Sequence, residues 1–179
     1  MMSITIVDIK PIVETDIALL EKRFPEAGPA KHAERFARQQ KGEAIYLIAW
    51  IQGQPAGHAL IKWGGSQDEP VARQIRTATP DIEDLFVYGE LRSQGIAGQL
   101  LSFAERLARE QGYTKVGLSV AVETNERARR LYERLGYQDA HFGEYTERGE
   151  YCDEQGQPQA WEERCIYLIK DLNTGGNQK

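Results

Sequence analysis

Residues 81–135 alternate between two kinds of sequence pattern. Two short apolar runs bounded by turn residues are typical of strands, and each precedes a longer segment in which apolar residues recur at helical spacing. The strands are predicted over 81–88 and 114–120, and the helices over 95–110 and 125–135. Because strands that alternate with helices form a parallel or mixed sheet, this stretch predicts an α/β fold.

The remaining segments extend this pattern toward both ends of the chain. They predict a strand over 3–9, helices over 15–24 and 30–40, a β-hairpin with strands over 44–51 and 56–63, a loop over 64–79, and a closing hairpin over 138–172 that ends in a strand over 166–169. No internal repeat is visible. The expected architecture is one domain over 1–172, a mixed central sheet flanked by helices, with a flexible tail over 173–179.

The composition narrows the classes of partner. With 22 Lys and Arg against 27 Asp and Glu, the formal net charge is -5, which argues against nucleic acid and suits a cationic small molecule. Cys152 and Cys165 are too few for a disulfide framework, and no Cys/His cluster has the spacing of a metal site. Neither a signal peptide nor an apolar run of about 20 residues is visible, so a soluble cytoplasmic protein without membrane contact is expected.

A turn rich in small residues lies between the strand at 81–88 and the next helix. It consists of Arg92, Ser93, Gln94, Gly95, Ile96, Ala97 and Gly98. Small residues let successive backbone N–H groups point at one spot, and the helix N-terminus adds positive potential, so the turn predicts a site for an anion such as pyrophosphate. The Gly-Lys-Ser/Thr of a P-loop is missing, and Ala97 and Leu100 stand where a dinucleotide fingerprint needs glycine.

Two motifs here resemble the GNAT superfamily of acyl-CoA-dependent N-acetyltransferases. One is R-x-x-G-x-A at 92–97, and the other is N-x-x-A-x-x-L-Y-x-x-L-G-Y at 125–137. The resemblance implies the GNAT fold, with acetyl-CoA as the cofactor and its pyrophosphate at the turn. It further implies that the preceding strand and the start of the last helix bind the pantetheine arm, through Leu85, Phe86, Val87, Asn125 and Ala128. Asn125 also fits a plain helix N-cap, and Leu85 to Val87 a core strand.

The same resemblance assigns the catalytic groups. Tyr132 matches the family's general acid, which protonates the departing thiolate, although a tyrosine on this helix face also fits simple packing. Residues 82–87 are similar to the strand of polyamine-type acetyltransferases, which makes Glu83 the expected base and places Asp84 at the acceptor site. Strand alternation predicts that Glu83 and Asp84 point to opposite faces of the sheet. Both fit exposed strand-end acids as well.

Together these features predict an enzyme that acetylates the primary amine of a small molecule by direct attack on acetyl-CoA. Two alternatives stay open: a protein N-terminus or lysine as the acceptor, and a regulatory module that binds acyl-CoA without catalysis. A nucleotide-dependent enzyme is disfavoured because its fingerprints are missing. A homodimer is common among such domains and is compatible with the sequence.

Overall fold

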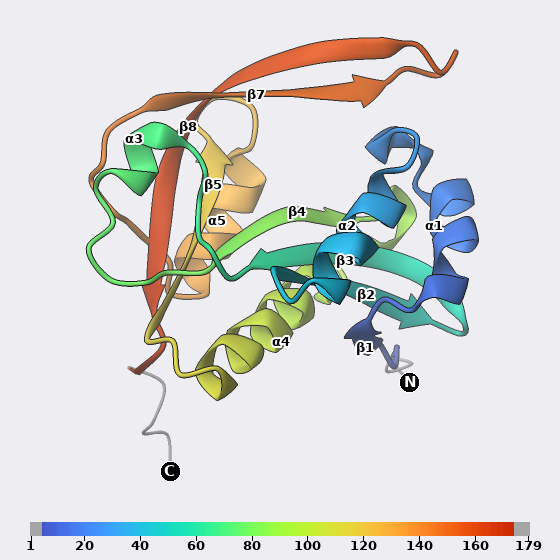
Figure 1. The fold of residues 1–179 in the computed structure, drawn as a ribbon, viewed down its shortest axis with the longest axis horizontal. Helices are drawn as coiled ribbons and strands as arrows, with labels where there is room; N and C mark the ends of the chain where they lie inside the picture. The colour runs from blue at the N-terminus through green and yellow to red at the C-terminus, as the bar shows by residue number, and fades with distance from the viewer. Residues whose placement is uncertain (1–4, 174–179) are drawn as a thin grey trace.

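An eight-stranded mixed sheet runs through the computed structural model, which describes residues 5–173 (Figure 1). Its strands are β1 (Asp8–Pro11), β2 (Ala44–Ile51), β3 (Gln54–Lys62), β4 (Asp81–Val87), β5 (Lys115–Ala121), β6 (Gln138–Asp139), β7 (Tyr145–Cys152) and β8 (Pro158–Asp171). They lie in the order β1-β2-β3-β4-β5-β8-β6, and β7 pairs with β8. Among the described pairs, β4 and β5 are parallel and the others antiparallel, which confirms the predicted mixed sheet.

Helices cover both faces of this sheet. They are α1 (Ile17–Arg23), α2 (Lys31–Gln40), α3 (Glu69–Ala72), α4 (Ile96–Glu110) and α5 (Glu126–Arg134), with short 3-10 turns at Glu14–Asp16, Pro25–Ala27 and Gly89–Leu91. The helices α1 and α2 pack on the face formed by β2 and β3, whereas α4 and α5 pack on the opposite face. The single-domain α/β architecture is therefore confirmed.

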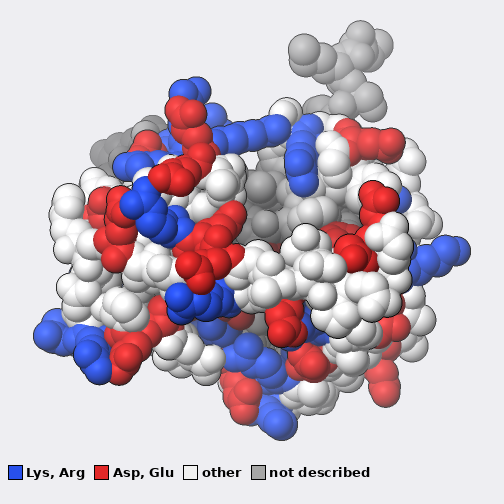
Figure 2. Space-filling view, turned by 90° about the horizontal axis from the view of Figure 1, so that it is seen from above, with Lys and Arg blue, Asp and Glu red and all other residues white. Residues whose placement is uncertain are grey.

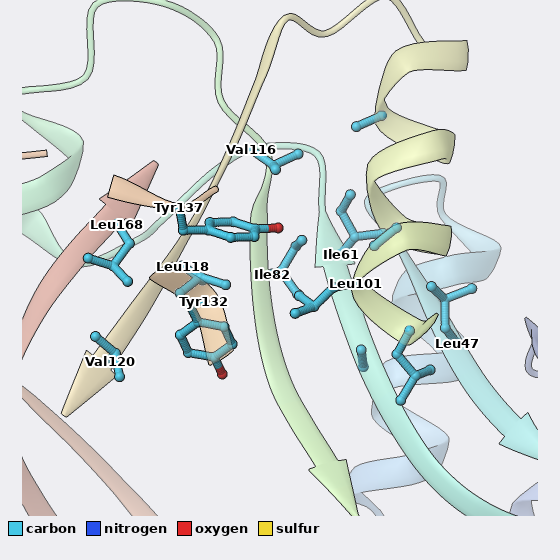
Figure 3. Close-up of a cluster of buried hydrophobic side chains, with 14 of the residues drawn as sticks. Leu47, Ile61, Ile82, Leu101, Val116, Leu118, Val120, Tyr132, Tyr137 and Leu168 are labelled. Carbon is cyan, nitrogen blue, oxygen red and sulfur yellow. The ribbon is translucent and has the colours of Figure 1, made fainter. Parts of the chain in front are cut away.

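Clusters of buried hydrophobic residues fill the space on either side of the sheet. The core under α4 and α5 includes Leu47, Ile61, Ile82, Leu101 and Leu118 (Figure 3). On the other face, Leu20 and Phe24 of the α1 region pack against Tyr46, Ile48 and Leu60. Because neighbouring residues of a strand point to opposite faces, burial of both faces explains why β2 and β3 are apolar almost throughout.

The last hairpin extends beyond the body of the sheet. The strand β8 pairs with β5 through Cys165–Asp171 and with β7 through Pro158–Cys165. Its β7 arm also lies beside the turn Pro25–Ala27, on the side of the sheet covered by α1 and α2 (Figure 1). The predicted closing hairpin is thus confirmed. Its β7 strand lies over the face of the sheet that α1 and α2 cover.

Some element boundaries differ from the prediction. The first strand covers Asp8–Pro11 instead of 3–9, because its pairing with β2 sets its limits, and residues 3 and 4 lie outside the described part. The segment expected as a loop contains α3, the final strand is longer than 166–169, and the short β6 was not predicted. Except for its first residue, the tail predicted over 173–179 also lies outside the described residues.

Candidate active site

The strands β4 and β5 separate soon after they meet. Their pairing is confined to Asp81 and Gly117. Beyond these residues β4 continues for six more residues and β5 for four. Figure 3 shows the two ribbons running apart toward their arrowheads. From Glu83 onward, the edge of β4 that faces β5 therefore has backbone groups without a strand partner among the described residues.

A β-bulge accompanies this separation. Glu83 pairs with Leu60 and Phe86 with His58, so that two residues of β4, Asp84 and Leu85, stand opposite one residue of β3. Asp84 has a φ of 53°, in the left-handed region. The extra residue shifts the alternation, since Leu85 contacts the α4 side of the sheet and Phe86 the α1 side.

The bulge overturns the prediction that Glu83 and Asp84 point to opposite faces. Glu83 lies 3.9 Å from a guanidinium nitrogen of Arg38, and Asp84 lies 3.0 Å from one of Arg35. Both arginines belong to α2. The left-handed backbone at Asp84 adds one residue to the strand, so the two carboxylates reach the same side.

Val87 directs its backbone into the opening between the strands. The N–H of the next residue, Tyr88, donates to the carbonyl of Ala56 in β3 at 2.9 Å. Because successive N–H groups alternate along a strand, the N–H and C=O of Val87 point away from β3 and toward β5. The carbonyl accepts a hydrogen bond from Arg92 Nε at 3.1 Å, and the N–H has no recorded partner in the described residues.

The predicted anion turn has the geometry of a helix N-terminal cradle. Ser93 and Gly95 have φ of 64° and 80°, and Gly95 is the N-cap of α4. The hydrogen bond from the N–H of Gln99 to the carbonyl of Gly95 opens the helical ladder, so the N–H groups of the first residues of α4 have no intrahelical acceptor. These groups suit an anion, and a small residue at the turn leaves them accessible.

Two arginines flank the turn. Arg92, expected to contact the pyrophosphate, is exposed and turns back to β4, where its guanidinium also lies 5.7 Å from the ring of Phe86. Arg127 of α5 donates to the hydroxyl of Ser93. The sequence motif did not indicate Arg127, which reaches the turn only because α5 packs beside it.

Asn125 performs the structural role that the sequence allowed. Its side chain accepts a hydrogen bond from the N–H of Ala128 at 3.3 Å and caps α5. A role of Asn125 and Ala128 in binding a cofactor stays a prediction.

Tyr132 lies between the separating strands. It is 7% exposed and packs in the core with Leu118 of β5 and Ile82 of β4. Figure 3 shows its hydroxyl directed toward the carboxyl ends of both strands. Burial raises the pKa of Tyr132 to about 12, so the phenol keeps its proton near neutral pH.

A buried lysine connects Glu83 to a second carboxylate. Lys62 Nζ lies 2.7 Å from Glu83 and 3.5 Å from Asp81, and the hydroxyl of Tyr167 donates to Asp81 at 2.9 Å. Burial raises the pKa of Asp81 to about 7, although Lys62 opposes the shift. Burial acts to lower the pKa of Lys62, but Glu83 and Asp81 outweigh it and raise that pKa. In the sequence, the only sign of this cluster of Lys62, Glu83 and Asp81 was a charged lysine at the end of an apolar strand.

Polar side chains of β5, β7 and β8 extend this region. The hydroxyls of Tyr145 and Ser119 are hydrogen-bonded, and Cys165 Sγ lies 3.6 Å from a carboxylate oxygen of Glu147. Burial raises the pKa of Glu147. These residues add acidic and hydroxyl groups near Asp81. The negative charge of Glu147 contributes to the raised pKa of Asp81.

Charged side chains of both signs are mixed on one face of the molecule. On the face shown in Figure 2, Lys and Arg side chains lie among Asp and Glu side chains instead of forming one basic region. Within residues 5–173, no helix combines the length and the apolar character needed to cross a bilayer.

Comparison with known proteins places these features in a family. The chain is 39% identical over 62 residues to the aminoalkylphosphonate N-acetyltransferase of Salmonella typhimurium, a match to 35% of this chain and 40% of that protein. It is 30% identical over 118 residues to the uncharacterized N-acetyltransferase YhfO of Bacillus subtilis, which covers 65% of this chain and 74% of the other. Less than half of the Salmonella protein is therefore matched.

A solved structure and a family model cover more of the chain. The structure of yncA from Salmonella typhimurium, determined with its cofactor acetyl-CoA, aligns with 97% of this chain and 98% of its own, with a TM-score of 0.64 and 18% identity. That likeness concerns the fold. Residues 15–137 match the family model described as the acetyltransferase (GNAT) family, and this range includes the anion turn and Tyr132. The chain therefore belongs to the GNAT family of acyl-CoA-dependent N-acetyltransferases.

Proposed function

We propose that this enzyme transfers an acetyl group from acetyl-CoA to the primary amine of a small molecule. The opening between β4 and β5 carries the proposal, because it combines an unpaired strand edge at Val87, a helix N-terminal cradle at one end and the Tyr132 hydroxyl beside it. An extended thioester with a pyrophosphate needs these three kinds of contact.

The residues present fit acetyl-CoA. The accessible N–H groups at the start of α4, with Ser93, Gln94, Gly95, Ile96, Ala97 and Gly98, would hold the pyrophosphate, and Arg92 and Arg127 lie near enough to add positive charge. The edge of Leu85, Phe86 and Val87 would bond the pantetheine amides. The N-terminal end of α5, with Asn125 and Ala128, would border the same arm.

Three groups of this chain would then act on the reacting atoms. The N–H of Val87 would donate a hydrogen bond to the thioester oxygen as negative charge develops there. Glu83 would accept a proton from the attacking amine, directly or through water, and Tyr132 would give its proton to the departing sulfur. The amine nitrogen gains the acetyl carbon, the carbon–sulfur bond breaks, and the thiol leaves neutral.

Two carboxylates, each already paired with a cation of this chain, would meet the amine of the acceptor. Asp84 and Glu83 lie on the α2 side with Arg35, Arg38 and Lys62 as partners, and the side chain of Asp84 is 40% exposed. Asp84 would contact the acceptor through its exposed oxygen. The β7 arm lies beside Pro25–Ala27 on this side of the sheet, and such a neighbour would favour a small acceptor over a folded protein.

Thiol release from acetyl-CoA with a panel of amines tests the proposal. The panel contains polyamines, amino acids, aminoglycosides, aminoalkylphosphonates and short peptides with free N-termini or lysines, and a reaction without amine measures hydrolysis. A small amine that accelerates release above hydrolysis supports the proposal. Acceleration by peptides alone would support a protein acceptor, and acetyl-CoA binding without release to any amine would support a regulatory module. A homodimer stays a prediction.

A further inference from the structure

The bulge that opens the site is built around a residue in an unfavourable conformation. Asp84 has φ of 53°, and only Gly, Asn and Asp visit that region routinely. The bulge also costs β4 part of its pairing with β3, where the register shifts between His58 and Leu60. Such a distortion persists when surrounding contacts over-determine it.

The main contact to Asp84 comes from a buried arginine. Arg35 of α2 is 9% exposed, and one of its terminal nitrogens lies 3.0 Å from a carboxylate oxygen of Asp84. The other terminal nitrogen donates to the hydroxyl oxygen of Tyr46 at 3.1 Å. A planar guanidinium that donates to two groups in this way fixes their relative positions. Arg35 therefore joins the bulge in β4 to β2.

The hydrogen bonds behind Arg35 have a defined direction. His32 Nε2 lies 3.1 Å from the carbonyl of Phe24, which can only accept, so this nitrogen carries the proton. His32 Nδ1 must then accept from the hydroxyl of Tyr46, at 2.9 Å. The Tyr46 oxygen is thereby left to accept from Arg35. Burial lowers the pKa of His32 and raises that of Tyr46, so both stay neutral near neutral pH.

A second histidine packs directly under the bulge. His58, which is 4% exposed and faces Phe86 in the strand register, stacks on the Phe86 ring at a centroid distance of 5.5 Å. Its ring also meets that of Phe24 edge-on, at a centroid distance of 5.1 Å. The bulge is thus packed by a ring of β3 at Phe86 and held by an arginine of α2 at Asp84.

We propose that Arg35 is a positioning residue for acetyl transfer, acting with Tyr46 and His32 to hold the Asp84 bulge and so to set the separation of β4 from β5. The inference rests on the proposed function, since the separated edge of β4 is where Val87 would meet the thioester. The ion pair also fixes Asp84 and Glu83 on one side of the sheet. Loss of Arg35 lets β4 return toward regular pairing and moves the Val87 N–H.

Substitutions at both ends of this ion pair test the proposal. Arg35→Met keeps the stem and removes the charge, Arg35→Lys restores a charge, and Asp84→Gly keeps the backbone conformation without the carboxylate. The control Arg106→Met breaks an exposed ion pair with Glu110 on α4, on the opposite face. Tyr46→Phe keeps Arg35 and removes the hydroxyl that joins it to His32, and it serves if Arg35→Met does not fold.

Three readouts separate positioning from simple stability. Arg35→Met lowers both kcat and acetyl-CoA affinity about tenfold, Arg35→Lys recovers part of each, and Tyr46→Phe gives a smaller loss in the same direction. In the Asp84→Gly background, Arg35→Met has little further effect, because the two residues act through each other. The amide NMR signal of Val87 shifts in Arg35→Met and not in Arg106→Met.

Independent losses for Arg35→Met and Asp84→Gly would overturn the proposal. So would an Arg35→Met protein that loses thermal stability but retains its kcat, its affinity for acetyl-CoA and the Val87 signal. Calorimetric binding of acetyl-CoA and the NMR signal need no acceptor amine. Failure of the amine panel therefore refutes the proposed function and leaves the test of Arg35 intact.

Discussion

Glu83 and Lys62 form an ion pair of 2.7 Å in which one partner is buried and the other reaches solvent. The side chain of Lys62 is 7% exposed and that of Glu83 is 35% exposed. Lys62 also lies 3.5 Å from Asp81, so the ammonium group has a second carboxyl group as a neighbour. The pair supports Glu83 as a base that faces an acceptor while its counter-ion remains inside the protein.

Glu83→Gln is expected to lower kcat by about 100-fold or more, with little change in acetyl-CoA affinity, because it removes the proton acceptor and keeps the shape of the side chain. Steady-state kinetics and calorimetry with acetyl-CoA measure the two effects. Glu43→Gln is the matched control, since Glu43 pairs with the same Arg38 at 3.7 Å. Full turnover in Glu83→Gln would exclude this residue as the base.

Tyr132→Phe is expected to reduce kcat by about 100-fold or more and to change acetyl-CoA affinity by less than about twofold, because the leaving sulfur loses its proton donor. Thiol-release kinetics at saturating substrates measure the loss. Tyr137→Phe is the control: it deletes a hydrogen bond of 2.9 Å to Glu105. It should lower the free energy of unfolding by about 1–3 kcal/mol and leave kcat unchanged. Equal kcat values for both variants would remove Tyr132 from the mechanism.

Gly95→Ala is expected to weaken acetyl-CoA binding. A Cβ at Gly95 meets nothing within 4 Å, so the cost arises from its φ of 80°, and the strain of about 1–2 kcal/mol distorts the cradle. Gly112→Ala imposes the same strain at the other end of α4, where φ is 86° and the Cβ is also unobstructed. Calorimetry should show weaker binding in Gly95→Ala alone, although both variants melt earlier. Equal affinities would place the pyrophosphate elsewhere.

Asp81 makes the stability of the protein depend on pH. The folded protein holds the Asp81 proton up to about pH 7, whereas the unfolded chain releases it near a pKa of ~3.9. Between these values the folded state binds more protons, so the contribution of Asp81 to the free energy of unfolding decreases as pH rises, by up to about 4 kcal/mol. Asp81→Asn should remove this decrease.

Urea unfolding at about pH 4.5 and about pH 7.5 measures the effect of Asp81→Asn as the difference between the two pH dependences. Asp8→Asn, at an exposed carboxylate beside Lys10, is the control. Identical pH dependences for the wild type and Asp81→Asn would show that Asp81 is already ionised at the lower pH in the folded protein.

The features that the sequence predicted are those that local residue patterns determine. Apolar periodicity indicated the order of strands and helices, and the small residues at 93–98 indicated the anion turn, because both depend on neighbours in the chain. The position of Tyr132 follows from its spacing along α5. These segments needed no knowledge of distant contacts.

The features that the sequence did not predict depend on contacts between distant segments. The bulge at Asp84 involves Arg35, which lies 3.0 Å away in space but in another element. Alternation along β4 therefore gave the wrong face for one carboxylate. The contacts of Lys62 with Asp81 and of Arg127 with Ser93 were not predicted either, because they also join segments that are distant in the sequence.

A crystal structure of the complex with acetyl-CoA tests the central claim most directly. The account predicts that the pyrophosphate lies against the N–H groups at the start of α4, that the thioester oxygen accepts from the N–H of Val87, and that the sulfur lies within hydrogen-bonding distance of the Tyr132 hydroxyl. A cofactor bound outside the opening between β4 and β5, or with its sulfur remote from Tyr132, would contradict it.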